Sequence, residues 1–147
     1  MNKITRRGFV AGAMGTAALA SATPLMAKSM DHMGHGGMAK NAKLSAAAAD
    51  CVIKGTECVD HCILLLKEKD LSLVKCLETA QDAVDACQLL MKYSAGNQKH
   101  LSALAEVCIK VCEDCAKECK KHIKKHENCK ACYDSCKECI KECKKVA

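Results

Sequence analysis

The chain has 147 residues, including 14 cysteines, and carries a formal net charge of +6 at pH 7. This length predicts a single domain. The charge is spread over many Lys and Glu side chains and no arginine follows Arg7, so the composition argues against a nucleic acid as partner. Tryptophan is absent and only one Phe is present, so another residue type must fill the core positions that Leu, Ile and Phe normally occupy.

Residues 1–27 have the order of features that is typical of an export signal. Basic residues come first, a weakly apolar run without acids follows, and small residues precede the expected cleavage site. The run Thr-Arg-Arg-Gly-Phe-Val, which contains Arg6 and Arg7, resembles a twin-arginine motif. We therefore expect a twin-arginine-type signal peptide and a protein exported to the periplasm, with a Sec signal or a retained anchor as the alternative.

Residues 28–43 are rich in Gly, Met and Lys and show no helical period, which predicts a flexible arm. The arm contains three Met and two His within nine residues, and these side chains are candidates for weak recruitment of a soft metal ion: Met30, His32, Met33, His35 and Met38. A linker without any metal-binding role is the alternative interpretation.

From residue 44 to the end, the pattern predicts four helices, and this part of the chain contains no proline. The expected spans are about 45–69, 70–95, 97–125 and 129–146. Expected N-cap residues are Ser45, Asp70, Asn97 and Asn128, and Gly96 is expected to end the second helix. Short connections between long helices favour antiparallel neighbours. The predicted fold is therefore all-α, an antiparallel four-helix bundle over residues 44–147.

The cysteines recur at intervals of three and four residues, which is the spacing of the core-facing side of a helix in a bundle. The ten residues that begin at Cys112 recur in similar form from Cys136, so the third and fourth helices form a repeated cysteine-rich hairpin. All 14 cysteines are predicted to line the core: Cys51, Cys58, Cys62, Cys76, Cys87, Cys108, Cys112, Cys115, Cys119, Cys129, Cys132, Cys136, Cys139 and Cys143.

Three explanations compete for so many cysteines. Disulfides are the default in a cysteine-rich secreted chain, but Cβ atoms four residues apart on a helix are about 5–6 Å apart, whereas a disulfide needs about 3.8 Å. Inert packing explains one or two buried thiols better than fourteen in register. Two thiolates on one metal ion are separated by at most about 4.6 Å, which side chains on the same helix and on facing helices can meet. The spacing therefore favours thiolate–metal chemistry.

Charge favours monovalent copper over zinc. Four thiolates around Zn²⁺ leave a net charge of −2 at each buried site, whereas Cu(I) accepts two or three soft ligands. If each thiolate bridges two Cu(I) ions, the core approaches neutrality and holds on the order of 10–15 ions per chain. Iron–sulfur clusters usually take their cysteines from a loop followed by proline, and the chain has no such loop.

The twin-arginine start, the Met- and His-rich arm, the run Cys58-Val-Asp-His61-Cys62 and the Cys-x2-Cys-x3-Cys ladders together resemble the bacterial copper storage proteins. The resemblance covers essentially the whole chain. It implies a four-helix bundle, often assembled as a homo-tetramer, that holds many Cu(I) ions in each bundle. It also implies that the 14 cysteines are the copper ligands, and that proteins could donate or accept the copper.

Four further side chains are secondary candidates for copper binding: His61, Met91, His122 and His126. The last two histidines continue the cysteine spacing of the third helix and are expected at one end of the bundle, where an ion could enter. Exposure to solvent is the alternative for the histidines, and core filling is the alternative for Met91.

The expected function is storage of Cu(I) for later supply to copper enzymes. A metallothionein-like sink that detoxifies soft metals uses the same chemistry and stays open. A thiol redox protein is a weaker alternative, because its Cys-x-x-Cys pair normally lies at a helix N-terminus, whereas the pairs here are repeated within helices. No catalytic residue is predicted, so we do not expect an enzyme.

Overall fold

The structure, a computed structural model, describes residues 41–147, so the predicted signal peptide and nearly all of the predicted arm lie outside the described residues. A short 3-10 turn, η1 (Leu71–Leu73), precedes the second of four α-helices. These are α1 (Ala42–Lys67), α2 (Val74–Ala95), α3 (Leu101–Cys119) and α4 (Glu127–Cys143). The described part contains no strand, and the prediction of an all-α four-helix bundle is confirmed.

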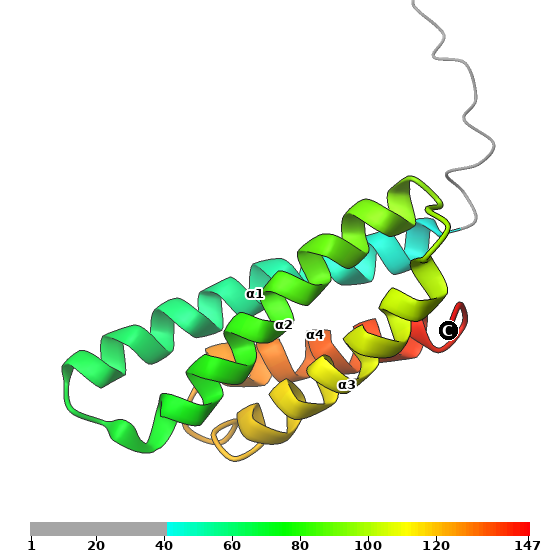
Figure 1. The fold of residues 1–147 in the computed structure, drawn as a ribbon. Coiled ribbons are helices and arrows are strands. Elements are labelled where there is room, and N and C mark those ends of the chain that lie inside the picture. Colours follow the sequence, from blue (N-terminus) through cyan, green and yellow to red (C-terminus); the bar gives the residue numbers. More distant parts are fainter. Residues whose placement is uncertain (1–40) are drawn as a thin grey trace, which may run out of the picture. The chain divides into compact units, whose positions relative to one another are not determined.

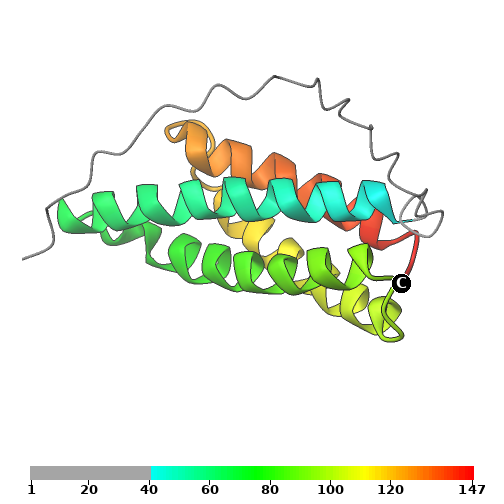
Figure 2. The same ribbon diagram turned by 90° about the horizontal axis from the view of Figure 1, so that it is seen from above.

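Each helix of the bundle packs along two neighbours, so that α1 and α3 both contact α2 and α4 (Figures 1 and 2). Neighbours in the chain run antiparallel, as the short connections predicted. One end of the bundle therefore carries the connections 68–73 and 120–126. The other end carries the connection 96–100, the start of α1 and the end of α4.

The helix boundaries differ from the predicted ones where residues distant in sequence decide the cap. The first helix begins at Ala42 rather than near Ser45. Its N-cap residue is Asn41, whose backbone oxygen accepts a hydrogen bond from the Ser45 amide and whose side chain donates to Asn97 Oδ1 over 3.0 Å. Because Asn97 takes part in this contact outside any helix, α3 begins four residues later than predicted, at Leu101.

Two helix ends use a left-handed residue other than glycine. Gly96 was expected in that role, but its φ is −88° and the left-handed residue is Asn97, with φ 46°. At the end of α1, Lys69 takes the same role with φ 67°. In both turns, backbone N–H groups bond the last carbonyls of the helix, which satisfies the groups that a helix end leaves unpaired.

The helix boundaries on either side of the connection 120–126, and at the start of α2, also differ from the predicted ones. The prediction that α3 extends to Lys125 is wrong, since the α-helix ends at Cys119 and the chain continues in tight turns. The prediction of Asn128 as N-cap is also wrong, because α4 begins at Glu127 after His126. Asp70 does cap, with its side chain accepting from the Ser72 amide, but it opens the 3-10 turn rather than α2 itself.

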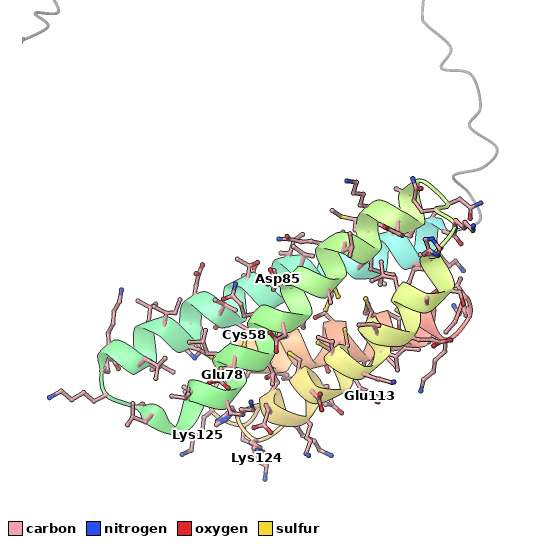
Figure 3. All side chains as sticks on the ribbon, in the orientation of Figure 1. Cys58, Glu78, Asp85, Glu113, Lys124 and Lys125 are labelled. Atoms are coloured by element: carbon pink, nitrogen blue, oxygen red, sulfur yellow. The ribbon has the colours of Figure 1, made fainter. Side chains whose placement is uncertain are left out.

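Cysteine thiols fill most of the core. All 14 cysteines are at most 1% exposed, which confirms the prediction that they line the interior. Figure 3 shows sulfur atoms between the helices, while labelled charged side chains such as Glu113 and Lys124 project outward. Leu44, Leu90 and Leu101 close the core at the end where α1 begins. Within residues 41–147, no helix is both long and apolar enough to cross a membrane.

Gly55 lets α1 and α2 approach closely halfway along the bundle. A Cβ atom at this position would lie 2.6 Å from Cγ2 of the buried Val84. We expect Gly55→Ala to destabilise the copper-free protein by up to about 2 kcal/mol, because overpacking costs about 1–3 kcal/mol and a helix-propensity gain of about 1 kcal/mol offsets only part of this cost. Chemical denaturation followed by circular dichroism measures the change.

The double variant Gly55→Ala/Val84→Ala is the control for this contact. Removing the Val84 methyl groups makes room for the new Cβ. The loss of stability in the double variant should therefore be smaller than the sum of the losses in the two single variants. An increase in stability for Gly55→Ala alone would contradict the close contact.

Candidate metal centre

The cysteines form a continuous set of free thiols rather than disulfides. In residues 41–147, the hydrogen-bonded sulfur pairs have Sγ–Sγ distances of 3.5–3.9 Å, well beyond a covalent S–S bond. These distances are close to the separation of about 4.0 Å between two sulfurs that each lie about 2.3 Å from one trigonal ion. The thiols are therefore spaced for metal ions between them.

One group takes a single cysteine from each helix. The Sγ atoms of Cys51, Cys87, Cys112 and Cys139 all lie within 4.8 Å of one another. Cys87 lies 3.7 Å from Cys112 and 3.8 Å from Cys139, so α2 meets both α3 and α4 through sulfur. We call this group the far quartet, because it lies toward the end where α1 begins.

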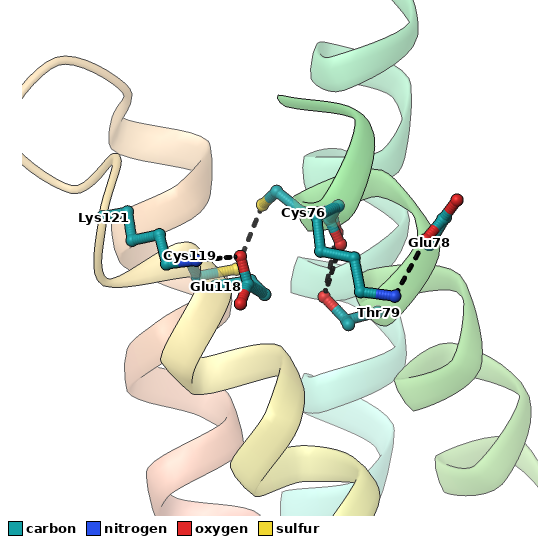
Figure 4. A network of polar contacts seen from close by, with 7 residues as sticks. Cys76, Glu78, Thr79, Glu118, Cys119 and Lys121 are labelled. Carbon is teal, nitrogen blue, oxygen red and sulfur yellow. Dashed lines mark hydrogen bonds and ion pairs between the residues drawn. The ribbon is translucent and has the colours of Figure 1, made fainter. Parts of the chain in front are cut away.

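A second quartet lies toward the end with two connections. It consists of Cys58, Cys62, Cys76 and Cys129, again with all sulfurs within 4.8 Å, and we call it the near quartet. Its Cys76 is 3.5 Å from Cys119 across the interface of α2 and α3 (Figure 4). Surface ion pairs flank this contact, such as Lys121 with Glu118.

Two triads extend the near quartet along the axis. The first joins Cys58, Cys119 and Cys132, and the second joins Cys115, Cys132 and Cys136. Cys58 is shared between the near quartet and the first triad, and Cys132 is shared between the two triads. Shared ligands are what a cluster of bridged Cu(I) ions requires, because each bridging thiolate binds two ions.

The remaining two cysteines lie outside these four groups. Cys143 follows Cys139 by one helical turn on α4, where the neighbouring Cys139 thiol raises its pKa, and so it adjoins the far quartet. Cys108 donates from Sγ to the backbone oxygen of Ala86 over 3.5 Å. Burial raises the pKa of Cys108 to about 12, because a thiolate there would lose its water without gaining a hydrogen bond. Cys108 therefore keeps its proton at neutral pH in the metal-free protein.

Each of the four groups contains at least one thiol whose pKa is lowered. Hydrogen bonds with Cys112 and Cys143 lower the pKa of Cys139 to about 5. Hydrogen bonds from neighbouring thiols lower the pKa of three more cysteines: Cys51, Cys76 and Cys132. A thiolate is the form that binds metal, so every group has a member prepared to take the first ion.

The charge around the thiols suits monovalent ions. Of the residues from 41 to 147, the buried ones include no lysine, and this part of the chain has no arginine. The one buried acid, Glu142, forms an ion pair with Lys145. With no buried cation to balance it, a Zn²⁺ ion with four thiolates would leave an uncompensated charge of −2 in each quartet. Bridged Cu(I) thiolates approach zero charge and avoid this cost.

Three histidines gather at the end with two connections, and we call this the histidine end. His61 Nε2 lies 3.0 Å from His126 Nδ1, and the ring centroids of His122 and His126 are 6.3 Å apart. Burial, followed by the proximity of His61 and His122, lowers the pKa of His126, so its imidazole stays neutral to a lower pH than usual. A neutral imidazole nitrogen can bind a metal ion.

The remaining candidate, Met91, and the cap residue Asp70 lie at opposite ends of the bundle. Met91 is 37% exposed near the end of α2, far along the bundle from the histidines, and it does not fill the core. Asp70 was predicted only as a helix cap, yet its carboxylate also interacts electrostatically with His126 and His122. The antiparallel topology could have indicated this, since both connections lie at one end. The arm's Met and His candidates lie outside the described residues.

Comparisons with known proteins agree with this geometry. A family model described as "Copper storage protein" matches residues 38–147. The chain is similar to the solved structure of a cytosolic copper storage protein from Streptomyces lividans with five coppers. The two are 26% identical with a TM-score of 0.68, over 77% of this chain and 96% of the other. A second structure, Ccsp from Streptomyces lividans with 10 copper equivalents, is 26% identical with a TM-score of 0.65, over 76% and 83% of the chains. No curated protein sequence matches the chain.

These comparisons contradict one prediction. The sequence predicted an exported, periplasmic protein, but the first of the similar structures is described as cytosolic. The export prediction rested on residues 1–27, which lie outside the described residues.

Proposed function

Because this chain belongs to the copper storage protein family, we propose that it stores many Cu(I) ions on the thiolates of its 14 core cysteines. The observation that carries the proposal is the linkage of two quartets and two triads of buried thiols along one axis, with no buried lysine or arginine among residues 41–147. A single catalytic or redox centre needs one such group, whereas linked groups give capacity. The proposal assigns the chain no catalytic role.

The two ends of the bundle differ in the ligands that they offer to an incoming copper ion. Copper would be captured at the histidine end, where His61 and His126 face each other beside the near quartet. The opposite end is closed by Leu44, Leu90 and Leu101, which offer no ligand for a metal ion. Within residues 41–147, copper therefore has one entrance, the histidine end, and release uses the same end.

Replacing His61 or His126 by Ala should slow Cu(I) uptake by about tenfold or more, because the ion then loses a neutral ligand on its way to the thiols. The final copper content should stay within about one ion of the wild-type value. Stopped-flow absorbance of the thiolate–Cu(I) charge-transfer band measures the rate, and elemental analysis measures the content.

His100→Ala is the matched control, since His100 caps α3 at the opposite end of the bundle. Its uptake rate should equal that of the wild type. Equal rates for all three variants would rule out the histidine end as the entrance.

Storage and detoxification differ in whether the copper can be retrieved. For a storage protein, we expect a strong Cu(I) chelator in excess to withdraw essentially all of the copper while the bundle stays folded. The emptied protein should then accept copper again to the same content. Dialysis against bathocuproine disulfonate, followed by elemental analysis and circular dichroism, tests this. Copper that leaves only when the protein is denatured would favour the metallothionein-like sink instead.

A further inference from the structure

The sulfur contacts divide the array into a near part and a far part. The near part comprises Cys58, Cys62, Cys76, Cys115, Cys119, Cys129 and Cys132. The far part comprises the far quartet with Cys108 and Cys143. Cys136 belongs to a triad with two near cysteines, and its Sγ also lies 3.7 Å from Sγ of Cys51 in the far quartet. Among the hydrogen-bonded sulfur pairs of residues 41–147, this is the only one that joins the two parts.

The division follows from the residues that α1 and α2 place halfway along the bundle. Between Cys51 and Cys58, the buried residue of α1 at this level is Gly55, which has no side chain. Between the two cysteines of α2, the fully buried residues are Ala80 and Ala83. The contact of Gly55 with Val84 leaves no room for a larger side chain. Two of the four helices therefore contribute no sulfur at this level, and we call it the waist.

Cys136 spans the waist from α4. The neighbouring thiols of Cys112 and Cys51 on the far side, and of Cys115 and Cys132 on the near side, raise the pKa of Cys136, so its sulfur lies among thiols of both parts. It is fully buried, so no water replaces a missing sulfur contact there. A Cu(I) ion that moves on from Cys115 and Cys132 therefore meets Cys136 before any thiol of the far quartet.

We propose that Cys136 is the crossing residue of the array, over whose thiolate Cu(I) passes from the near part to the far part. The proposal rests on the copper storage function above. In the step, a Cu(I) ion held by the thiolates of Cys132 and Cys115 forms a bond to Cys136 Sγ as its bond to Cys115 breaks, and the freed Cys115 thiolate takes up the proton of the Cys136 thiol. A bond to the Cys51 thiolate then forms as the bond to Cys132 breaks. Copper stays Cu(I) throughout and never has fewer than two sulfur ligands.

The test compares the loss of the Cys136 thiol with the loss of a buried side chain that is not a metal ligand. Cys136→Ala removes the crossing, and Cys136→Ser does so with nearly unchanged volume, in case the cavity impairs folding. Ser135→Ala is the matched control, because Ser135 is the buried neighbour of Cys136 on α4 and its Oγ donates to the backbone oxygen of Cys132.

Uptake is followed on protein labelled with ¹⁵N only at cysteine, which gives one amide NMR signal for each cysteine. Saturating Cu(I) is added as its acetonitrile complex, and elemental analysis reports the final content. Cys76 and Cys87 are compared directly, because they lie on the same helix on opposite sides of the waist.

In the wild type and in Ser135→Ala, we expect the Cys87 signal to shift within a few-fold of the time that Cys76 needs. In both Cys136 variants, Cys76 should shift at the wild-type rate and Cys87 at least about tenfold later. Their final copper content should fall by only one or two ions. Cys87 keeping pace with Cys76 in these variants, or shifting first in the wild type, would overturn the crossing. No shift of Cys76 in the wild type would instead refute copper storage itself.

Discussion

Titration of the reduced protein with Cu(I) should saturate at on the order of 10–15 ions per chain, whereas Zn²⁺ should saturate at two or three. The two quartets are the only sets of four mutually close thiols in residues 41–147, and each can hold one tetrahedral zinc ion. Copper needs only two or three sulfurs per ion, so the shared cysteines of the triads and the contacts between groups also become sites. Elemental analysis after removal of unbound metal gives both numbers.

Competition between the two metals is the sharper form of this experiment. Protein saturated with zinc and then given one equivalent of Cu(I) per thiol should release all of its zinc, because filling with Cu(I) removes the uncompensated negative charge of the core. Release can be followed with a zinc-sensitive dye. Saturation at three or four copper ions, or zinc that stays bound in the presence of copper, would contradict a core of bridging thiolates.

The period of the cysteines was enough to predict the core. Intervals of three and four residues place side chains on one face of a helix whatever the helix packs against, and all 14 thiols are buried as this requires. The four-helix architecture followed from the absence of proline and from the short connections. Residue spacing, proline content and connection length can all be read from the sequence without knowing how the helices pack.

The grouping of the thiols could not be predicted, because it depends on how far each helix slides along its neighbours. Cys51 meets Cys136, 85 residues away, only because α1 and α4 pack in this register. The same holds for His61 and His126, which are 65 residues apart. Ala80 and Ala83 could be recognised as core positions without sulfur, but the waist needs Gly55 at the same level on α1, and that again is a matter of register.

The boundaries that sequence analysis missed have a similar cause. Asn97 is a good N-cap residue by type, but in the structure it hydrogen-bonds with Asn41 and ends the turn after α2. Its left-handed conformation replaces the one expected for Gly96. Local preference allowed both arrangements, and a contact between distant segments selected one of them.

The copper-free, reduced protein should already be folded and helical, and copper should then raise its unfolding temperature by more than about 20 °C. Folding without metal is expected because the core has apolar side chains of its own, among them Leu44, Leu73, Leu90 and Leu101, and because neutral thiols pack as small apolar groups. In the described residues, no buried side-chain nitrogen or oxygen lacks a hydrogen-bond partner. Far-UV circular dichroism with and without copper measures the helix content.

The stabilisation by copper follows from binding that the folded state favours. An ion that binds only the folded chain at a free concentration of 100 times its Kd adds about 2.7 kcal/mol, and a change of 1 kcal/mol moves the midpoint of a domain of this size by about 4–8 °C. Unfolded thiols also bind Cu(I), which reduces the gain per ion, but they cannot reproduce the linked groups that share ligands. Coil that becomes helical only when copper is added would instead place the chain among proteins whose folding requires the metal, and a constant midpoint would mean that the copper is not bound in the core.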